Sequence, residues 1–396
     1  MMKSNNGGAP FTNDELSEIR SAFPMLQDGI IYMNHAAVSP LSKPVTDRMR
    51  KHLSGRSHGQ IDTFKRDFKS FEKARELVKD LINAESSDRI SFTQNTSHGL
   101  NIVAHGLKWH NGDHIILNDL EFPANVYPYL NLEPRGVKVD FIRNRNGRIT
   151  PNMIENALRP QTRLVAISAV QFLSGFMADL KAIGELCKQR GIWFVVDGIQ
   201  ALGARRIDVQ GMNIDALATG GHKWLMGPQG AGFLYLSESV QNEIINQHIG
   251  WLSVEEPWEL FNYDQPLHKT ARRYEIGTPN THGIHGLLAS LELMSEIGYD
   301  RIEGQILHLT GELIDEIKEW EDCDMYSPIP EEERAGIVTV DLPENIDTDT
   351  LLQKLKDKKL HVAIREGLLR IAPHYYNSSS EVEQATGIIR KAIDSI

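Results

Sequence analysis

A lysine inside a glycine-rich segment is the strongest candidate for a reactive residue in this sequence. Lys223 follows Gly220, Gly221 and His222, and Trp224 comes next. A phosphate-binding P-loop needs GxxxxGK[ST] opening a helix after a strand, and the residues on either side of this lysine do not fit. The alternatives are a lysine that forms a Schiff base with an aldehyde, which needs a partly desolvated pocket, and a surface lysine on a turn. The motif alone favours the surface lysine.

An aspartate at the end of an apolar run changes that balance. Residues 193–196 are Trp-Phe-Val-Val, and Asp197 follows directly. A carboxylate at the end of a buried strand is costly unless it is paired. It can cap the next turn, or it can accept a hydrogen bond from a pyridinium N–H and keep a pyridoxal phosphate (PLP) ring ready to accept electrons. Asp197 followed 26 residues later by Lys223 favours PLP chemistry more specifically than either residue alone.

The segments around these two residues alternate between strand and helix patterns. Strands are expected over residues 89–93, 114–117, 138–142, 163–169, 193–196, 216–218 and 232–236, with helices over 97–106 and 180–190 between them. Such alternation indicates an α/β fold with a mostly parallel sheet of seven strands. Chemistry in such sheets collects at the carboxyl ends of the strands, which is where Asp197 lies.

The two ends of the chain follow other patterns. Helices are expected over residues 13–22 and 64–82, the second with aromatic residues at helical spacing. After residue 280 the sequence predicts long helices over 284–297 and 302–320, short strands over 337–341, 361–364 and 369–372, and a final helix over 381–396. We therefore predict an N-terminal segment (1–25) packing on the small domain, a large PLP-binding domain (26–279) and a smaller α+β C-terminal domain (280–396).

Composition argues against several classes of function. The chain has 396 residues and a net charge of −11, from 42 Lys+Arg against 53 Asp+Glu, without the basic groove that nucleic-acid binding needs. Cys187 and Cys323 have no CxxC partner, so neither a disulfide framework nor a metal site is predicted. No segment approaches the roughly 18 apolar residues of a membrane span, and the first ten residues do not resemble a signal peptide. We expect a cytoplasmic protein.

Taken in order, these motifs resemble the class V aminotransferase family within the fold type I PLP enzymes. That superfamily also contains cysteine desulfurases, selenocysteine lyases, kynureninases and isopenicillin-epimerase-like proteins. The resemblance extends from Tyr32 to the final helix. It implies a large domain around a seven-stranded sheet, a smaller C-terminal domain and bound pyridoxal 5'-phosphate.

The resemblance assigns the ring of the cofactor to five residues. Lys223 matches the Schiff-base lysine, and His222 matches the residue before it. Asp197 matches the partner of the pyridine nitrogen, and Gln200 matches the residue that reaches the phenolic oxygen. Phe122 matches the aromatic residue that stacks on the ring.

The phosphate is expected at a helix N-terminus. Thr96 and Ser97 open a predicted helix, whose free N–H groups and dipole suit an anion. Thr219 is expected to help, because Gly220 stands where many relatives have a serine, and Gln171 is a further cofactor contact. The resemblance also implies that Thr278 reaches the phosphate of the neighbouring subunit, and hence a homodimer with shared active sites.

The substrate is expected to bind through its carboxylate. Arg370 resembles the arginine that holds this group, and its planar fork suits a carboxylate. Asn34 and His35 are also expected to line the substrate site. Further candidates for its walls are Trp251, Arg272 and Arg365.

Two departures from the desulfurases bear on the reaction. These enzymes commonly have a histidine where Phe122 stands, and a nucleophilic cysteine shortly before the carboxylate-binding arginine. Residues 362–368 contain no cysteine. We therefore expect an aminotransferase, in which Lys223 removes the Cα proton and the amino-acid substrate leaves as a keto acid. The alternatives are a lyase or an epimerase of the same superfamily.

Overall fold

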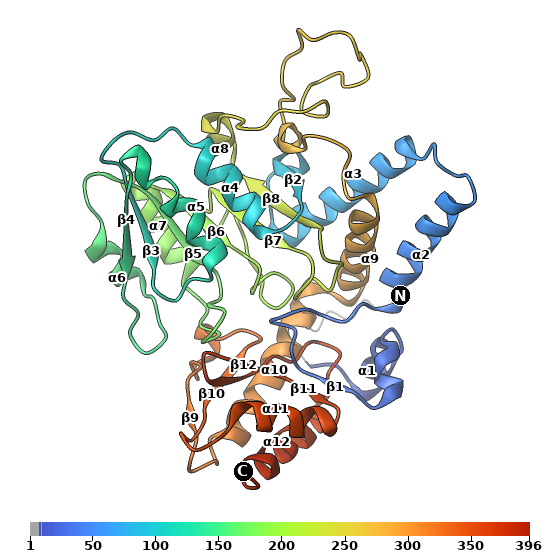
Figure 1. Cartoon of the computed structure of the whole chain (residues 1–396), viewed down its shortest axis with the longest axis vertical. Coiled ribbons are helices and arrows are strands. Elements are labelled where there is room, and N and C mark those ends of the chain that lie inside the picture. Colours follow the sequence, from blue (N-terminus) through green and yellow to red (C-terminus); the bar gives the residue numbers. More distant parts are fainter. Residues whose placement is uncertain (1–7, 9) are drawn as a thin grey trace.

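A seven-stranded sheet forms the centre of the large domain, with the strand order β2-β8-β7-β6-β5-β3-β4 (Figure 1). The computed structural model describes residue 8 and residues 10–396. The strands are β2 (Ile90–Thr93), β3 (His114–Asn118), β4 (Lys138–Ile142), β5 (Thr162–Ser168), β6 (Trp193–Asp197), β7 (Ala216–Gly220) and β8 (Gly232–Leu236). Neighbours from β4 to β7 pair in parallel, and β8 is antiparallel to β7 and β2. The predicted sheet is confirmed.

Helices cover both faces of this sheet, which explains why its strands are apolar without alternation. In β6, Phe194 and Val196 belong to one hydrophobic core and Val195 to the other. The helices of this domain are α2 (Lys43–Ser57), α3 (Phe64–Ile82), α4 (Thr96–Gly106), α5 (Tyr127–Leu130), α6 (Pro151–Ala157), α7 (Leu180–Arg190), α8 (Glu238–Glu243) and α9 (Thr281–Ile297). α4 packs on β7 and β8, whereas α9 packs on α2 and α3.

The small domain has its own antiparallel sheet, with the order β12-β13-β10-β9. Its elements are α10 (Tyr299–Ile317), β9 (Asp324–Met325), β10 (Val338–Asp341), α11 (Thr348–Asp357), β11 (Leu360–His361), β12 (Ala363–Arg365), β13 (Leu368–Ile371) and α12 (Ser379–Ile393). A separate core includes Leu313, Val340, Leu369 and Ile389. Strand β1 (Ile31–Tyr32) pairs in parallel with β11, so the chain enters the large domain through the small one.

The N-terminal helix α1 (Asn13–Arg20) also rests on the small domain. Thr12 caps it in a reciprocal capping box with Glu15. Glu15 pairs with Arg301 of α10 at 2.8 Å, and Arg20 pairs with Glu381 of α12 at 2.8 Å. The packing of the whole segment 1–25 on the small domain stays a prediction, because residues 1–7 and 9 lie outside the described residues.

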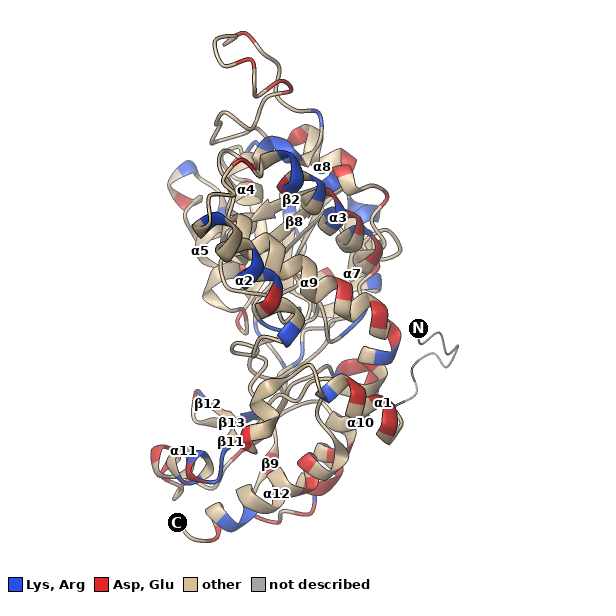
Figure 2. Cartoon of the chain, turned by 90° about the vertical axis from the view of Figure 1, so that its right-hand side faces the viewer, with Lys and Arg blue, Asp and Glu red and all other residues tan. Residues whose placement is uncertain are grey.

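Some elements differ from the prediction. Helix α2 was not predicted, and the expected strand over 361–364 is two strands, β11 and β12. Helix α9 follows the predicted boundary at residue 280 yet packs on α2 and α3 of the large domain; the exact boundary stays a prediction. Within the described residues, no helix combines the length and apolar character that a membrane crossing requires. Acidic and basic residues alternate along the ribbon of both domains (Figure 2).

Candidate active site

The carboxyl ends of β6 and β7 bring the two predicted reactive residues together. Asp197 is the last residue of β6 and pairs in register with Ala218 of β7. Strand β7 ends at Gly220, and Lys223 follows after a turn. Parallel neighbours end at the same edge of the sheet, so residues 26 positions apart in the sequence share one site.

Both groups are removed from water, and this shifts their pKa values in opposite senses. Burial raises the pKa of Asp197, and the nearby Glu121 adds to the rise while Lys223 opposes it. Burial lowers the pKa of Lys223, and the charge of Asp197 opposes that change. One carboxylate oxygen of Asp197 accepts the Ile199 N–H at 2.9 Å. A buried carboxylate with capacity for a further donor suits a pyridinium N–H, and a lysine with a lowered pKa suits attack on an aldehyde.

Phe122 lies over the lysine. Its ring centroid is 5.7 Å from Nζ of Lys223, and Phe172 packs edge-on against it at 5.4 Å. The ring is 45% exposed, so one face is available to a ligand. This position fits the stacking role predicted for Phe122.

Glu121 is a residue that the sequence analysis missed. Its carboxylate is buried and accepts hydrogen bonds from the Ser168 N–H at 2.7 Å, from Asn125 at 3.0 Å and from Gln171 Nε2 at 3.2 Å. These bonds fix Gln171 so that its Oε1 is buried without a partner among the described residues. The signal that the sequence offered for Glu121 was its place directly before Phe122, the predicted stacking residue.

The predicted phosphate end lies at the start of α4. Asn95 caps this helix by accepting the His98 N–H at 2.9 Å. The Thr96 hydroxyl is buried, and no hydrogen-bond partner for it occurs in the described part of the chain. Ser97 and Phe122 line the same cavity of 600 Å³. An anion at the N-terminus of α4 would satisfy both the hydroxyl and the free N–H groups of the helix.

The glycine at position 220 has a local structural reason. A Cβ at this position would stand 3.0 Å from Nδ1 of His222, so a serine here would require the ring of His222 to shift slightly. Thr219 is buried, and its hydroxyl makes a long contact of 3.3 Å to the Gly220 carbonyl. Thr219 is therefore free to turn toward a better acceptor or donor.

Arg370 occupies the side of the site nearest the small domain. It lies on β13 and is 2% exposed. Its Nη1 donates to the Phe172 carbonyl at 2.8 Å, whereas Nε has no partner among the described residues. Burial, together with the charge of Arg365, lowers the pKa of Arg370 to about 10. A buried guanidinium with donors to spare suits a carboxylate ligand. Asn34 Oδ1 is likewise buried without a partner in the described chain.

Other predicted residues already have partners. Gln200 Oε1 accepts the Trp224 indole N–H at 2.9 Å, and its Nε2 donates to Ala36 at 3.1 Å. His35 is fully buried, with Nδ1 2.7 Å from the Ala372 carbonyl and Nε2 2.9 Å from the Tyr376 hydroxyl. Both ring nitrogens of His35 are thus engaged within the protein.

The remaining predicted residues lie at the edge of the site or outside it. The side chain of Thr278 is exposed. Arg272 forms an ion pair with Glu72, and Trp251 packs against Trp258 at 5.3 Å. Arg365 is different, because its charge lowers the pKa of both Lys223 and Arg370. Of the three further wall candidates, Arg365 has the clearest link to the site.

The hairpin before Arg370 is short. Strands β12 and β13 pair in antiparallel register through Glu366 and Gly367, whose φ angles are 49° and 81°. Two successive positive φ angles are typical of a type I′ two-residue turn. Such a turn leaves no loop that could present a cysteine.

The two cysteines are held elsewhere. Burial raises the pKa of Cys187 to about 12, and this residue belongs to the core under α7. Burial, with the charge of Asp322, raises the pKa of Cys323 to about 11 in the small domain. Neither thiol has the lowered pKa that nucleophilic cysteines require.

The residues present fit PLP. An aldehyde has Lys223, a pyridine nitrogen has Asp197, a ring face has Phe122, and a phosphate has the unpartnered Thr96 hydroxyl at the start of α4. Buried polar atoms without partners are rare in folded proteins, and several of them facing one site indicate a ligand. The fold and this site define a PLP-dependent enzyme of fold type I.

Comparison with known proteins places the chain within that class. The family model for class-V aminotransferases matches residues 31–388. The chain belongs to the class V aminotransferase family, as the resemblance predicted. A probable cysteine desulfurase of Methanothermobacter thermautotrophicus is 31% identical over 388 residues, covering 92% of this chain and 95% of that protein.

Solved structures share the fold. The apo cysteine desulfurase of Thermococcus onnurineus is 28% identical, with a TM-score of 0.87 over 96% of this chain and 98% of that one. Two structures of the lyase C-DES are each 22% identical with a TM-score of 0.85, covering 95% and 94% of this chain and 99% of theirs. One is a mutant with glycine covalently linked to the PLP cofactor, and the other is a complex of this cystine C–S lyase with its product, cysteine persulfide.

Proposed function

We propose that this protein is a PLP-dependent carbon–sulfur lyase that acts on a cysteine-type amino acid, cystine or cysteine, by elimination at Cβ. The observation that carries the proposal is the two-residue turn at Glu366 and Gly367. The site keeps the lysine, aspartate and arginine of its family, yet the hairpin next to Arg370 has no thiol to take up sulfur. Relatives named as cysteine desulfurases support a sulfur amino acid as substrate. The cystine lyase offers a precedent on the same fold.

Each residue has a defined task in this reaction. When bound, PLP supplies an electron sink for the charge that develops at Cα. Arg370 binds the substrate carboxylate and so fixes which bonds of Cα face the cofactor. Lys223 would hold the aldehyde of the cofactor at rest and take the Cα proton of the substrate during the reaction. Its lowered pKa favours the neutral amine that this step needs.

The bonds that change define the products. The substrate loses its Cα–H bond and its Cβ–S bond, and the sulfur leaves with the electrons of the second bond. After hydrolysis, the carbon skeleton leaves as pyruvate and the nitrogen as ammonia. Cystine and one water thus give pyruvate, ammonia and cysteine persulfide, whereas cysteine and one water give pyruvate, ammonia and hydrogen sulfide. No protein thiol takes part.

Transamination is the second candidate, and the same missing thiol favours it. Lys223 would take the Cα proton and give it up again, and no group would leave Cβ. The substrate would then leave as a keto acid, and a second keto acid would be needed to complete the cycle. Phe122 supports either reaction, because a phenyl ring holds the cofactor and moves no proton.

We also propose that two copies of the chain share their active sites. The exposed side chain of Thr278 supports this arrangement. Ile276, two residues earlier, lines a cavity of 570 Å³ together with Ser97 at the start of α4. A segment from a second copy could therefore approach the phosphate end of the site from this side.

The test is a product analysis of the PLP-loaded enzyme. Cystine, cysteine and alanine are supplied in turn, each with and without 2-oxoglutarate, and pyruvate, ammonia, sulfide, alanine and glutamate are measured. The proposal expects equal amounts of pyruvate and ammonia from a sulfur amino acid, with no need for 2-oxoglutarate. Glutamate formation that depends on 2-oxoglutarate, without sulfide or persulfide, would support transamination. Alanine from cysteine would indicate desulfurase chemistry and overturn the proposal, as would racemised substrate alone.

A further inference from the structure

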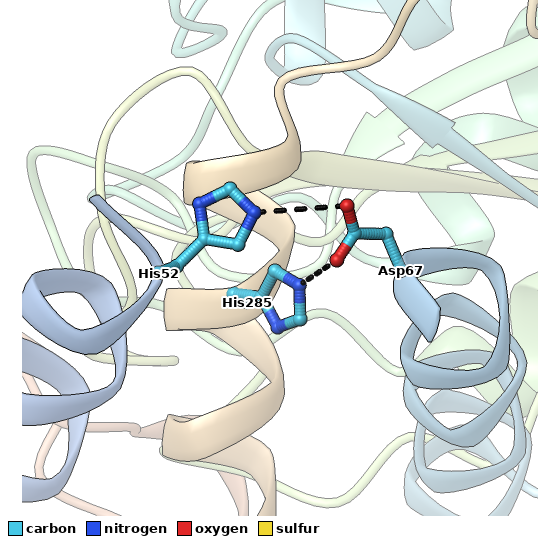
Figure 3. Close-up of side chains that lie close together, drawn as sticks. All are labelled: His52, Asp67 and His285. Carbon is cyan, nitrogen blue, oxygen red and sulfur yellow. Dashed lines mark hydrogen bonds and ion pairs between the residues drawn. The ribbon is translucent and has the colours of Figure 1, made fainter. Parts of the chain in front are cut away.

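Three helices outside the active site bring a second group of titratable side chains together. His52 lies on α2, Asp67 on α3 and His285 on α9 (Figure 3). Nε2 of His285 is 2.9 Å from one carboxylate oxygen of Asp67, and Nε2 of His52 is 3.7 Å from the other. One ligand atom from each residue can be chosen so that all three lie within 4.8 Å of one another.

This group is withdrawn from water. The side chains of His52, Asp67 and His285 are 8%, 9% and 10% exposed. Nε2 of His52 is buried and has no hydrogen-bond partner among the described residues. A buried nitrogen without a partner is costly, and this nitrogen points toward the carboxylate from beyond hydrogen-bond distance. Something that binds between them would remove the cost.

Hydrogen bonds from neighbouring side chains orient His52 and Asp67. Nδ1 of His282, one turn before His285 on α9, is 2.9 Å from Nδ1 of His52. When the Nδ1–H of His52 donates to His282, Nε2 of His52 keeps its lone pair and directs it at the cluster. The Thr63 hydroxyl donates to Asp67 at 2.6 Å. Such outer hydrogen bonds, which fix the tautomer of a histidine and the rotation of a carboxylate, usually accompany metal ligands.

We propose that His52, Asp67 and His285 bind one divalent transition-metal ion, for which Zn²⁺ is the probe, with water as the fourth ligand. Two imidazole nitrogens and one carboxylate oxygen select Zn²⁺ and its neighbours over Mg²⁺ or Ca²⁺, which prefer oxygen. Tetrahedral Zn²⁺ with bonds of about 2.0–2.1 Å needs ligand atoms about 3.3 Å apart. The three chosen ligand atoms lie within 4.8 Å of one another, so modest side-chain movements would bring them to this spacing.

The local charges suit a cation. Nε2 of His285 and Asp67 already share a hydrogen bond of 2.9 Å, and the ion would take the place of its proton. Burial, aided by His285, lowers the pKa of His52 and keeps its ring neutral. Arg66 approaches Asp67 at 3.8 Å, but its side chain is 57% exposed and can turn into solvent.

A metal here would fasten α2, α3 and α9 to one another. α9 in turn supports the segment that carries Lys223, because the Ser290 hydroxyl of α9 donates to the Leu225 carbonyl. A Cβ at Gly221 would stand 3.0 Å from Leu287 of the same helix. The ion would therefore stabilise the support beneath the reactive lysine without touching the substrate.

The experiment uses the PLP-loaded full-length enzyme, stripped with a chelator and then dialysed against Zn²⁺. We expect one Zn²⁺ per chain by elemental analysis, and a rise in melting temperature of about 3 °C or more at 100 times the Kd. Mg²⁺ should give neither result. The isosteric variant Asp67→Asn and the variant His52→Gln should bind Zn²⁺ at least about tenfold more weakly, whereas the exposed control His110→Gln should bind it as the wild type does.

A second measurement avoids dependence on variants that fold poorly. Co²⁺ added to the wild-type enzyme should give the intense visible bands of a four-coordinate site, and one equivalent of Zn²⁺ should abolish them. Less than a tenth of an ion per chain, or only weak octahedral Co²⁺ bands, would overturn the proposal. So would unchanged Zn²⁺ affinity in Asp67→Asn, since this would assign the bound ion to surface histidines.

Discussion

The site around Lys223 and the cluster around His52 are both built from buried polar side chains, but they arise in different ways. Lys223 and Asp197 follow adjacent parallel strands, so the sheet itself determines that they meet. His52, Asp67 and His285 lie on three separate helices, and only the packing of α9 on α2 and α3 brings them together. The arrangement around Lys223 follows from the local spacing of residues in the sequence. The arrangement around His52 depends on tertiary packing.

This difference also separates what each group can do. Lys223 has an available aromatic face beside it, in Phe122, and an arginine with unused donors, in Arg370. The histidine cluster differs: its aromatic neighbour, Phe71, is buried, and its arginine, Arg66, is largely exposed. We therefore expect changes at Lys223 to affect chemistry, and changes at the cluster to affect metal content and stability.

The largest expected effect comes from Lys223→Ala. This change removes both the amine that holds the cofactor and the base that takes the Cα proton, so kcat should fall by about 10³-fold or more. Absorption spectra before and after borohydride reduction should show that PLP is no longer covalently fixed. The exposed Lys108→Ala is the matched control and should behave as the wild type. Covalent attachment of PLP in Lys223→Ala would assign the Schiff base to another lysine and contradict the role proposed for Lys223.

A smaller loss is expected from Arg370→Lys. Lysine keeps the charge but cannot offer two parallel donors to a carboxylate. One charge-assisted hydrogen bond contributes about 1.5–3 kcal/mol, so kcat/KM should fall by about 10- to 100-fold, chiefly through KM. Steady-state kinetics with cystine would measure it, with the exposed Arg50→Lys as control. An unchanged KM together with a normal PLP spectrum would remove Arg370 from substrate binding.

For a physical reason, the sequence predicted the site around Lys223 better than the cluster around His52. Strand ends and helix starts follow from local patterns, and these patterns placed Asp197 at the end of β6 and Thr96 at the start of α4, where the structure has them. They could not show that the ring of His35 is already engaged by Ala372 and Tyr376. Those contacts join segments more than 300 residues apart in the chain.

The cluster of His52, Asp67 and His285 could not be predicted from the sequence for the same reason. His285 lies on the helix predicted over 284–297 and His282 just before it, and this spacing is a weak signal on its own. Asp67 reads as one charge on an amphipathic helix, and α2, which carries His52, was not predicted at all. A cysteine-based search for metal sites gave no indication of a ligand set made of two imidazoles and one carboxylate.

The proposed metal site should depend on pH in a definite direction. Imidazole must be neutral to bind a metal, so Zn²⁺ affinity should fall as the pH drops below the ordinary histidine pKa of about 6.5. Because the pKa of His52 is lowered, its own loss of affinity should come at still lower pH. The pKa of Asp67 is lowered as well, so this carboxylate stays ionised over the same range.

Calorimetric titration of the chelator-treated holoenzyme with Zn²⁺ at pH 7, 6 and 5 would measure this dependence. We expect binding at pH 5 to be at least about tenfold weaker than at pH 7, since imidazole ligands must lose their protons to bind the ion. Mg²⁺ provides the control for unspecific binding to carboxylates. Affinity that stays constant down to pH 5 would exclude imidazole ligands.

The smallest effect is expected from Cys323→Ala, and it tests whether the active site is complete without a thiol. Cys323 is the less buried of the two cysteines, but it lies in the small domain, and burial together with Asp322 raises its pKa to about 11. A thiol with such a pKa is overwhelmingly protonated at neutral pH and is a poor nucleophile. Pyruvate formation from cystine should therefore stay within about twofold of the wild type.

The same assay with cysteine, in the presence and absence of a reductant, reports whether sulfur ever resides on the protein. If Cys323→Ala lost most of its activity while keeping the PLP spectrum and melting temperature of the wild type, the small domain would have to bring a thiol to Lys223. The reaction would then belong with the desulfurases, despite the short turn before Arg370.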